Sequence, residues 1–418
     1  MTNPPNTSAG KQDAKEILVT GTFDVRNYGD LLFPLIAGAR LSPHGIVVKA
    51  CSPSGLETGW ADCMAPLSPA AMSEPRFPLK GILVGGGNIV HAKNARLTEY
   101  RLGDLSDWAY SSLWLGASIA GAIHNIPVAW NAPGVPAPLP KALAEHVFMP
   151  QLAEACEYFS VRDAASVNNL GLAGQRASIV PDTAVDLASL WPRKSLEPDF
   201  AALIERKAMS RDARFMTVHV KERSVSTALA ELGTQIGEFA TAHNLVPILL
   251  ALAPCHDDDV AARHVARFIK GPKVVVDDVC GLREVAGAIA NAQLHLGASL
   301  HGYITAAAYD VPSVLVAQPK LEKYDGFLAQ IDRSDDLVET WEAALPRAAE
   351  QLGEKLAAPM LPTAVHAAAD AHWAKVAAAF LTPRRTQVER TRFLRSYLRY
   401  GINREDLGWM LRPASRDA

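Results

Sequence analysis

This sequence has few cysteines, no long apolar run and no large excess of either charge. Its five cysteines are odd in number and none lies in a C-x-x-C pair, which argues against a disulfide framework or a thiolate zinc site. No apolar run approaches the ~20 residues that a membrane-spanning helix needs. The net charge of −3 gives no overall attraction to nucleic acid. These absences predict a protein of a reducing compartment, which we expect to be the cytoplasm.

The remaining composition is that of a folded globular protein. Hydrophobic residues make up 49% and charged residues 20% of the 418 positions. A chain of this length exceeds what one core usually holds, so two domains are expected. Residues 1–16 are rich in Pro, Asn and Ser and contain no apolar stretch. They predict a short disordered arm rather than a secretory signal.

Short β-branched runs alternate with Ala- and Leu-rich stretches along most of the chain. The runs are continuously apolar, as in parallel strands that helices cover on both faces. The expected strands are residues 17–20, 46–50, 82–84, 127–130, 158–161 and 177–180 in a first series, and 215–220, 246–252, 274–276, 294–297 and 313–316 in a second. The expected helices are residues 31–41, 106–123, 228–243, 282–291 and 303–309.

A Trp- and Pro-rich patch at residues 189–198 separates the two series and is the best candidate for a linker. Two consecutive βαβ series predict an α/β protein with two Rossmann-like domains, at residues 17–190 and 200–360, that face each other across a cleft. Ligands of such sheets bind beyond the carboxyl ends of the strands. The residues just after each strand are therefore the candidates for function.

The last part of the chain, residues 361–418, predicts helices and a basic tail. Residues 363–381 are dense in alanine, and from Arg384 to the last residue there are nine arginines, no lysine and four acidic residues. Gly401 is a plausible end for a helix expected at 390–400. Four apolar residues share one face of that helix: Phe393, Leu394, Tyr397 and Leu398. The helix either docks onto the first domain with its basic face in water, or lies against anionic membrane headgroups.

Four groups of polar residues and glycines follow strands of the first series. They are Asn27, Gly29 and Asp30; Gly85, Gly86, Gly87 and Asn88; Arg162; and Asp182. Glycines after a buried strand let the backbone approach a phosphate or sugar, and an arginine at a strand end suits a carboxylate or phosphate. Each group has a structural alternative: a helix cap, a tight turn, or an Arg-Asp turn with local capping. The three glycines match neither G-x-G-x-x-G nor a Walker loop, so dinucleotide and P-loop interpretations lose support.

The most informative group follows the expected strand at 294–297 and contains Ser299, His301 and Gly302. A histidine between a strand end and a helix N-terminus is aimed at the cleft and suits a general acid or base. Lys320, after the next strand, is expected to reach the same cleft as a charge partner. The acidic run at 256–259 is the one group that suggests a metal, but a solvated helix start is the simpler interpretation. We therefore expect no metal.

Taken in their order along the chain, these five motifs resemble those of the polysaccharide pyruvyl transferase family, over residues 17–324. The resemblance implies a glycosyltransferase-B-like fold. It also implies transfer of a pyruvyl group from phosphoenolpyruvate to a sugar in surface polysaccharide biosynthesis, without a further cofactor. The product would be a cyclic ketal across two hydroxyls, with phosphate released. The acceptor would be a carbohydrate or a lipid-linked glycan, which would bring the protein to the inner membrane surface. The sequence carries no sign of the oligomeric state.

The chain departs from the family where the donor should bind. Ser299 stands where the family typically has an arginine. The family tends to have a second arginine at the end of the first strand of the second domain, where this chain has Lys221 and Arg223. Either of these two could supply the charge, although lysine lacks the planar fork of arginine. The implied roles are His301 as acid or base, and Arg162, Lys221 and Arg223 as clamps for carboxylate and phosphate. Two alternatives stay open: a glycosyltransferase that uses a nucleotide-sugar, and a non-catalytic glycan-binding member.

Overall fold

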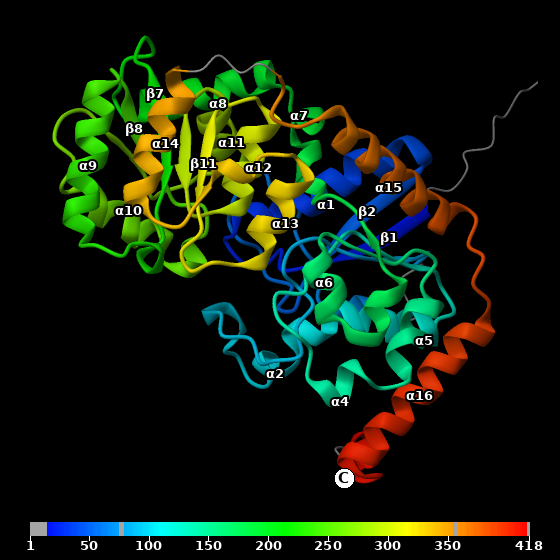
Figure 1. Cartoon of the computed structure of the whole chain (residues 1–418). Helices are drawn as coiled ribbons and strands as arrows, with labels where there is room; N and C mark the ends of the chain where they lie inside the picture. The colour runs from blue at the N-terminus through cyan, green and yellow to red at the C-terminus, as the bar shows by residue number, and fades with distance from the viewer. Residues whose placement is uncertain (1–14, 75–78, 354–357, 416–418) are drawn as a thin grey trace, which may run out of the picture.

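The computed structural model describes residues 15–74, 79–353 and 358–415. It contains two parallel β-sheets flanked by helices, followed by a helical C-terminal segment (Figure 1). The predicted fold class is confirmed. The arm expected at 1–16 lies outside the described residues except for Lys15 and Glu16, which do not belong to an arm because they begin the first strand.

The first sheet has the strand order β2-β1-β3-β4 among the described residues. Its strands run parallel and are largely buried, which explains their continuously apolar sequences. A bridge between Ala129 and Tyr158 continues this sheet to the parallel pair β5-β6. The strands are β1 (Lys15–Thr20), β2 (Ile46–Cys51), β3 (Ile82–Val84), β4 (Val128–Trp130), β5 (Ser160–Val161) and β6 (Ser178–Ile179).

The helices of this half surround the first sheet. The helix expected at 106–123 is present as two α-helices joined by a π-helical turn. The helical elements are α1 (Tyr28–Leu41), α2 (Leu105–Ser111), the π-turn η4 (Ser112–Gly116), α3 (Ala117–Ile123), α4 (Lys141–Ala144), α5 (Phe148–Ala155), α6 (Ala164–Asn169), the 3-10 helix η6 (Thr183–Asp186) and α7 (Leu187–Leu190).

The second sheet has the order β12-β11-β10-β7-β8-β9 and is also parallel. Its strands are β7 (Phe215–His219), β8 (Val246–Leu250), β9 (Val274–Val276), β10 (His295–Gly297), β11 (Ser313–Val316) and β12 (Leu337–Val338). Its helices are α8 (Arg193–Arg206), α9 (Leu229–Ala242), α10 (Asp258–Ala266), α11 (Leu282–Ala290), α12 (Leu300–Ala308), α13 (Glu322–Gln330) and α14 (Trp341–Gly353). The sequence missed β12, whose two residues are too few for a pattern.

The prediction of a linker at 189–198 is wrong for most of that range. Helix α8 begins at Arg193 and runs through Pro198. It packs along α11, and its Leu196 is fully buried. Tertiary packing of this apolar side chain therefore overrides the helix-breaking tendency of the proline.

In each sheet the chain first adds strands in one direction and then returns to add the remaining strands on the other side of the first strand. This switch lies between β1 and β3 in the first sheet and between β7 and β10 in the second. In open parallel sheets the binding crevice lies at such a point, beyond the carboxyl ends of the strands. The segments 21–30 and 85–88 follow β1 and β3, and the segments 220–223 and 298–302 follow β7 and β10. The topology thus places most of the sequence motifs at the two switch points.

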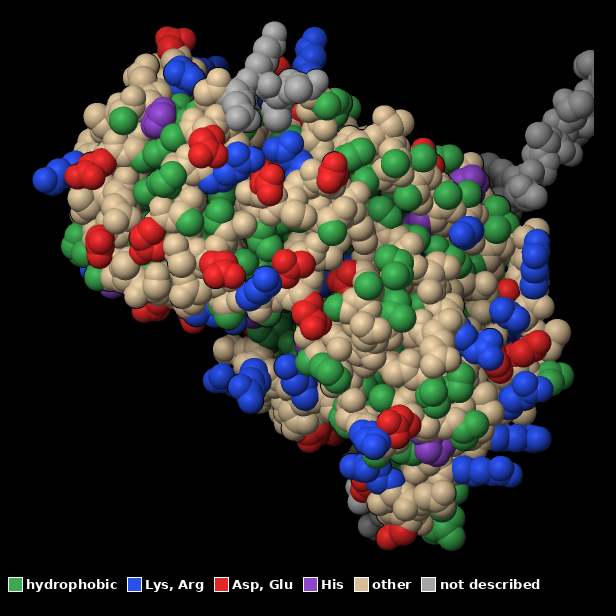
Figure 2. Space-filling model, viewed as in Figure 1, with side chains coloured by type: hydrophobic (Ala, Val, Ile, Leu, Met, Phe, Trp, Pro, Cys, Tyr) green, Lys and Arg blue, Asp and Glu red, His purple; other side chains and the backbone are tan. Residues whose placement is uncertain are grey.

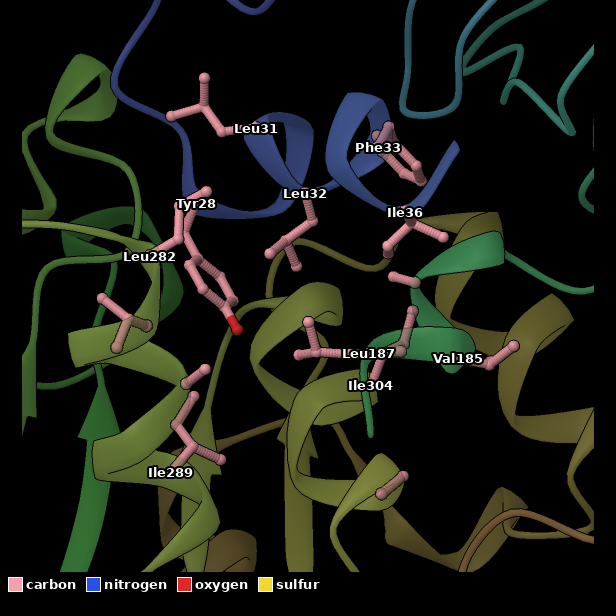
Figure 3. Packing of buried hydrophobic residues seen from close by; sticks show 14 of the residues in the cluster. Tyr28, Leu31, Leu32, Phe33, Ile36, Val185, Leu187, Leu282, Ile289 and Ile304 are labelled. Atoms are coloured by element: carbon pink, nitrogen blue, oxygen red, sulfur yellow. The ribbon is translucent and has the colours of Figure 1, made fainter. Parts of the chain in front are cut away.

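Helix α1 joins the two halves. Figure 3 shows Tyr28 and Leu32 of α1 pointing toward Leu282 and Ile289 of α11 and Ile304 of α12. All five side chains are buried and belong to one apolar cluster that extends through both halves. Burial of each such side chain contributes ~1.5–3 kcal/mol. The halves therefore share a core along α1.

The C-terminal helices return to the first half of the molecule. Helix α15 (Thr363–Leu381) packs beside α1, β4 and η6, and α16 (Gln387–Glu405) lies across α3 and α5 (Figure 1). The docking interpretation of the tail is confirmed, because Phe393 is fully buried and Tyr397 meets Phe148 edge-on. Gly401 does not end the helix as predicted. The space left by its missing side chain is filled instead by Trp409 of the short α17 (Gly408–Ser415). None of the described helices has the length and apolar content to cross a bilayer.

Candidate active site

The N-terminal turns of α1 and α12 meet where the two halves join. Gly29 lies directly beside His301, and a methyl group at position 29 would overlap the imidazole. The Oη of Tyr28 and the Oγ1 of Thr305 share a hydrogen bond of 3.0 Å, and the Tyr28 N–H donates to the Leu252 carbonyl at 2.8 Å. These bonds hold the first turn of α1 against the second half. Because glycine has no Cβ, the ring of His301 can enter the junction.

His301 faces a buried carboxylate from the other half. Its Nε2 lies 3.6 Å from Asp182 Oδ2, and its side chain is 12% exposed. Phe33 of α1 meets the imidazole edge-on, with ring centroids 5.5 Å apart. The Nε2 atom has no hydrogen bond to any described residue. This nitrogen is buried and faces the carboxylate, so Asp182 and His301 have the arrangement of a carboxylate that orients an acid-base imidazole.

Asp182 is ionised at neutral pH. Burial raises the pKa of this carboxyl, but the proximity of His301 and the charge of Arg162 outweigh burial and bring the pKa to about 2. One oxygen also accepts a hydrogen bond of 3.1 Å from the Ala184 N–H, so Asp182 caps η6 as well. An ionised carboxylate beside an imidazole orients the ring and stabilises its protonated form.

Arg162 connects Asp182 to the glycine-rich turn. Its Nε lies 3.3 Å from Asp163 Oδ2, its Nη1 lies 3.4 Å from Asp182 Oδ2, and its Nη2 donates to Asn88 Oδ1. Asp163 also caps α6 by accepting from the Ser166 N–H at 2.6 Å, so the local-capping alternative holds too. Because the buried guanidinium is turned to these protein groups, Arg162 positions Asp182 and Asn88 rather than offering an open face to a ligand.

The two turns of the first half touch each other. Gly87 has a φ of +83°, and a side chain there would meet Asp30 Oδ1 at 2.8 Å. Asp30 in turn accepts hydrogen bonds of 2.9 Å from Asn27 Nδ2 and from Thr22 Oγ1. Gly85 and Gly86 are buried against the Thr20 carbonyl and Phe33. The structure thus brings together the first two groups that the sequence singled out.

Lys323, rather than Lys320, lies at this junction. Lys320 is exposed, 3.7 Å from Asp325. Lys323 lines a small hollow with Asn88 and Arg162. Burial, and after it the positive charges of Arg162 and Lys221, lower the pKa of Lys323 to about 7. Both lysines follow β11, and only the turn of the chain into α13 decides which one faces inward.

Two residues predicted to bind the donor, Ser299 and Gly302, support helix α12. Ser299 is its N-cap, and its Oγ accepts a hydrogen bond of 3.4 Å from the Gly302 N–H. Gly302 is buried, and a Cβ there would meet His295 and Leu252. Because α12 begins at Leu300, three residues earlier than expected, His301 lies inside its first turn.

A cleft of about 830 Å³ opens between the segment that precedes α2 and the loops after β7 and β8. Five basic residues line it: Lys93, Arg96, Arg101, Lys221 and Arg223. The acidic residues of its lining are Glu222 and Asp257, and none of the five cations forms an ion pair with a described carboxylate. Figure 2 shows Lys and Arg side chains gathered on the segment around α2, below the second half. Such a cleft attracts anionic ligands.

The acidic run at 256–259 starts helix α10, as expected, and His256 and Asp257 are exposed, but Asp258 is not solvated. Asp258 is fully buried, and its Oδ2 accepts hydrogen bonds from His219 Nε2 at 2.7 Å and from the Ala253 N–H at 2.9 Å. Burial opposes its ionisation, but His219 and Lys221 lower its pKa. Burial also lowers the pKa of Lys221, which Asp258 partly offsets. Within the described residues, no three His, Cys, Asp or Glu side chains group so as to hold a metal ion.

Sequence reasoning missed the basic residues before α2. The signal was present in the run from Lys93 to Arg101, where three cations follow the glycine-rich turn. Without the tertiary structure this run has the pattern of an ordinary solvated loop. Its role in lining the cleft depends on the second half, which supplies Lys221 and Arg223 from the opposite side.

The family model described as polysaccharide pyruvyl transferase matches residues 27–318, which include Gly29, Asp182 and His301 of the junction described above but not Lys323. The chain belongs to the polysaccharide pyruvyl transferase family. The family predicted from the motifs is therefore confirmed, and the protein is a member of a transferase family. Among curated proteins, none matches the sequence.

Solved structures show what this family member resembles in fold. One is described as a UDP-N-acetylglucosamine 2-epimerase from Listeria monocytogenes, with a TM-score of 0.53 and 12% identity over 89% of this chain and 98% of that one. Another is the UDP-GlcNAc 2-epimerase from Methanocaldococcus jannaschii, with a TM-score of 0.52 and 14% identity over 85% and 97%. At such identities the likeness is one of fold alone, and that fold is glycosyltransferase-B-like.

Proposed function

We propose that this family member transfers a pyruvyl group from phosphoenolpyruvate to two hydroxyls of one sugar. The observation that carries the proposal is the pairing of His301 with ionised Asp182, together with two cations, Lys221 and Lys323, whose pKa values are lowered by burial and by neighbouring positive charges. Like charges so close together disfavour one another until an anion arrives. A donor with a carboxylate and a phosphate would neutralise them.

The reaction needs one acid-base group beside the reacting carbon. In the first step, C3 of phosphoenolpyruvate takes a proton, and a sugar hydroxyl bonds to C2 while giving up its own proton. In the second step, another hydroxyl of the same sugar bonds to C2, the C2–O bond to phosphate breaks, and phosphate leaves with the second proton. His301 supplies the first proton and recovers one from the hydroxyl. Asp182 stabilises the imidazolium that exists before the first transfer and again after the second, and Arg162 holds Asp182 in place.

The acceptor we propose is a glycan that carries phosphate. The basic cleft is lined by Lys93, Arg96 and Arg101 on one side and by Lys221 and Arg223 on the other. These are more cations than one donor needs. A sugar joined through a phosphate or diphosphate to a carrier lipid would use the remainder.

A membrane contact through the tail is part of the same proposal, in an altered form. The apolar residues expected to enter the membrane are turned to the protein, since Phe393 and Tyr397 pack on α5. What stays exposed is the opposite face of α16, with Arg392, Arg395 and Arg399. Each cation near an anionic leaflet contributes ~1 kcal/mol. We therefore expect weak, salt-sensitive attachment to the cytoplasmic leaflet.

Phosphate release tests the reaction. The full chain is incubated with phosphoenolpyruvate and glycans that present two neighbouring hydroxyls, and separately with nucleotide-sugars and the same glycans. We expect phosphate only with phosphoenolpyruvate, together with a pyruvyl ketal on the glycan. Turnover of nucleotide-sugars alone would instead establish the glycosyltransferase alternative. Glycan binding without turnover of any donor would establish the non-catalytic alternative.

His301→Ala identifies the acid-base residue within that assay. Loss of a general acid-base group lowers turnover by about 10²–10⁴-fold, and the fold should persist because the side chain is partly exposed. His124→Ala, at an exposed histidine after α3, is the matched control and should leave turnover unchanged. Near-normal turnover of folded His301→Ala would remove His301 from the mechanism.

A further inference from the structure

We infer that helix α15 positions Asp182 through a chain of buried hydrogen bonds, although α15 lies outside the region that matches the family. The inference rests on the proposed function in taking Asp182 and His301 as the acid-base pair. Asp182 is the N-cap of η6, so its carboxylate can hold still only if η6 does. Helix α15 packs directly on η6, and two of its adjacent side chains reach the two ends of that segment.

The first arm starts at His372 and ends next to Asp182. His372 Nε2 lies 2.8 Å from Asn131 Oδ1, and Asn131 Nδ2 donates to Thr183 Oγ1 at 3.3 Å. On the other side of the ring, Nδ1 lies 3.1 Å from Tyr158 Oη. An amide oxygen only accepts, so the imidazole hydrogen sits on Nε2 and the Tyr158 hydroxyl donates to Nδ1. The hydrogen bonds thus run in one direction, from Tyr158 to Thr183.

This arm is neutral and sealed from water. The exposed fractions are 1% for His372, 0% for Asn131 and 1% for Thr183. Burial, followed by the charges of Lys375 and Arg40, lowers the pKa of His372 to about 3, so the ring keeps this tautomer at neutral pH. A buried polar group that loses its partner destabilises the arrangement that leaves it unpaired. Each bond of the arm therefore strongly favours one placement of Thr183.

The second arm holds the far end of η6. Trp373 Nε1 donates to Asp186 Oδ2 at 2.7 Å, and Arg40 Nε of α1 lies 3.5 Å from the same oxygen. Trp373 and Asp186 are both buried. With one arm on Thr183 and the other on Asp186, η6 cannot turn about its axis without breaking a buried hydrogen bond. Its N-cap, Asp182, is thereby fixed 3.6 Å from His301.

Substitutions in the first arm test this role, because they leave the side chains of Asp182 and His301 unchanged. His372→Phe removes both ring nitrogens, and Thr183→Val removes the last acceptor while keeping the side-chain volume. His372→Gln keeps an N–H donor and is the conservative rescue. His366→Phe makes the same chemical change at an exposed position of α15 and is the matched control. Circular dichroism and thermal unfolding establish that each variant is folded.

The decisive readout is the reactivity of His301 itself, which does not depend on pyruvyl transfer. We measure the rate at which diethyl pyrocarbonate acylates His301, mapped by mass spectrometry in the full-length protein. Loss of its carboxylate partner should make His301 react at least threefold faster in His372→Phe and Thr183→Val, with rates near wild type in His372→Gln and His366→Phe. Turnover of phosphoenolpyruvate should fall at least tenfold in the first two variants, with less than threefold change in KM.

The outcomes separate this inference from the proposed reaction. An unchanged His301 acylation rate in folded His372→Phe and Thr183→Val overturns the positioning role, even if both variants are less stable. If the wild-type protein does not turn over phosphoenolpyruvate but the acylation pattern appears, the pyruvyl transfer is refuted and the positioning of Asp182 stands.

Discussion

Gly29 shows how one missing side chain determines the geometry of the junction. Because a Cβ at this position would overlap the imidazole of His301, Gly29→Ala must displace the ring from its present position beside Asp182. A displacement of ~1 Å at a reacting group costs about 10²-fold in rate, so we expect turnover to fall by that factor. Gly38→Ala, nine residues further along α1, is the matched control, since its Cβ would meet only the Met64 Cε at an ordinary 3.9 Å. A Gly29→Ala variant as active as Gly38→Ala would contradict the described approach.

Lys323 gives donor binding a pH dependence of defined sign. Its pKa is lowered to about 7, so the unliganded protein loses this positive charge as pH rises through 7. We expect phosphoenolpyruvate to bind about tenfold more weakly at pH 8.5 than at pH 6.5, the value of one charge-assisted contact. Calorimetric titration measures the affinity for phosphoenolpyruvate at each pH, and Lys323→Met should remove most of the difference between the two affinities.

A rise in pH weakens donor binding through Lys323, but it has the opposite effect on the stability of the unliganded protein. Between pH 7 and about 10 the unfolded chain keeps the lysine proton that the folded protein has released. The contribution of Lys323 to the free energy of unfolding therefore rises with pH across that window when no ligand is bound. Lys320→Met is the control for both measurements, because Lys320 is exposed and paired with Asp325. Equal pH profiles for Lys323→Met and wild type would show that another group titrates.

At the scale of the element, helix α12 separates two interpretations of Ser299. As the N-cap that accepts from the Gly302 N–H, it should affect folding rather than donor binding. We expect Ser299→Ala to lower the free energy of unfolding by about 1 kcal/mol and to change KM for phosphoenolpyruvate less than threefold. Thr386→Ala removes the corresponding N-cap of α16, far from the cleft, and should have a similar effect on stability. A tenfold rise in KM confined to Ser299→Ala would make Ser299 a donor ligand.

At the scale of the whole molecule, the exposed face of α16 is what a membrane can meet. Deleting the tail would uncover the surface of α3 and α5 that Phe393 covers, and would leave buried Glu157 without its partner Arg390. Charge substitutions are therefore the better test. We expect the triple variant in which Arg392, Arg395 and Arg399 become Gln to lose flotation with anionic vesicles at low salt.

The control for that experiment makes the same charge change elsewhere. Arg263, Arg267 and Lys270 are exposed at the end of α10, on the second half, and their replacement by Gln should leave flotation unchanged. Wild-type flotation should disappear as salt is raised, because exposed charges are screened. If the wild type does not float at low salt, the tail is only a docking helix.

The sequence by itself determined the fold class, most strand positions and the family. Continuous apolar runs specify buried parallel strands, and glycines and helix caps specify turns, because both act over a few neighbouring residues. The tertiary structure alone decided which lysine faces the junction, that Arg162 is turned to protein carboxylates, and that the tail buries its apolar face. It also decided that His372 reaches Asn131, 241 positions earlier in the chain. Such contacts follow from how helices and sheets stack, and no local pattern encodes which distant side chain will fill a given space.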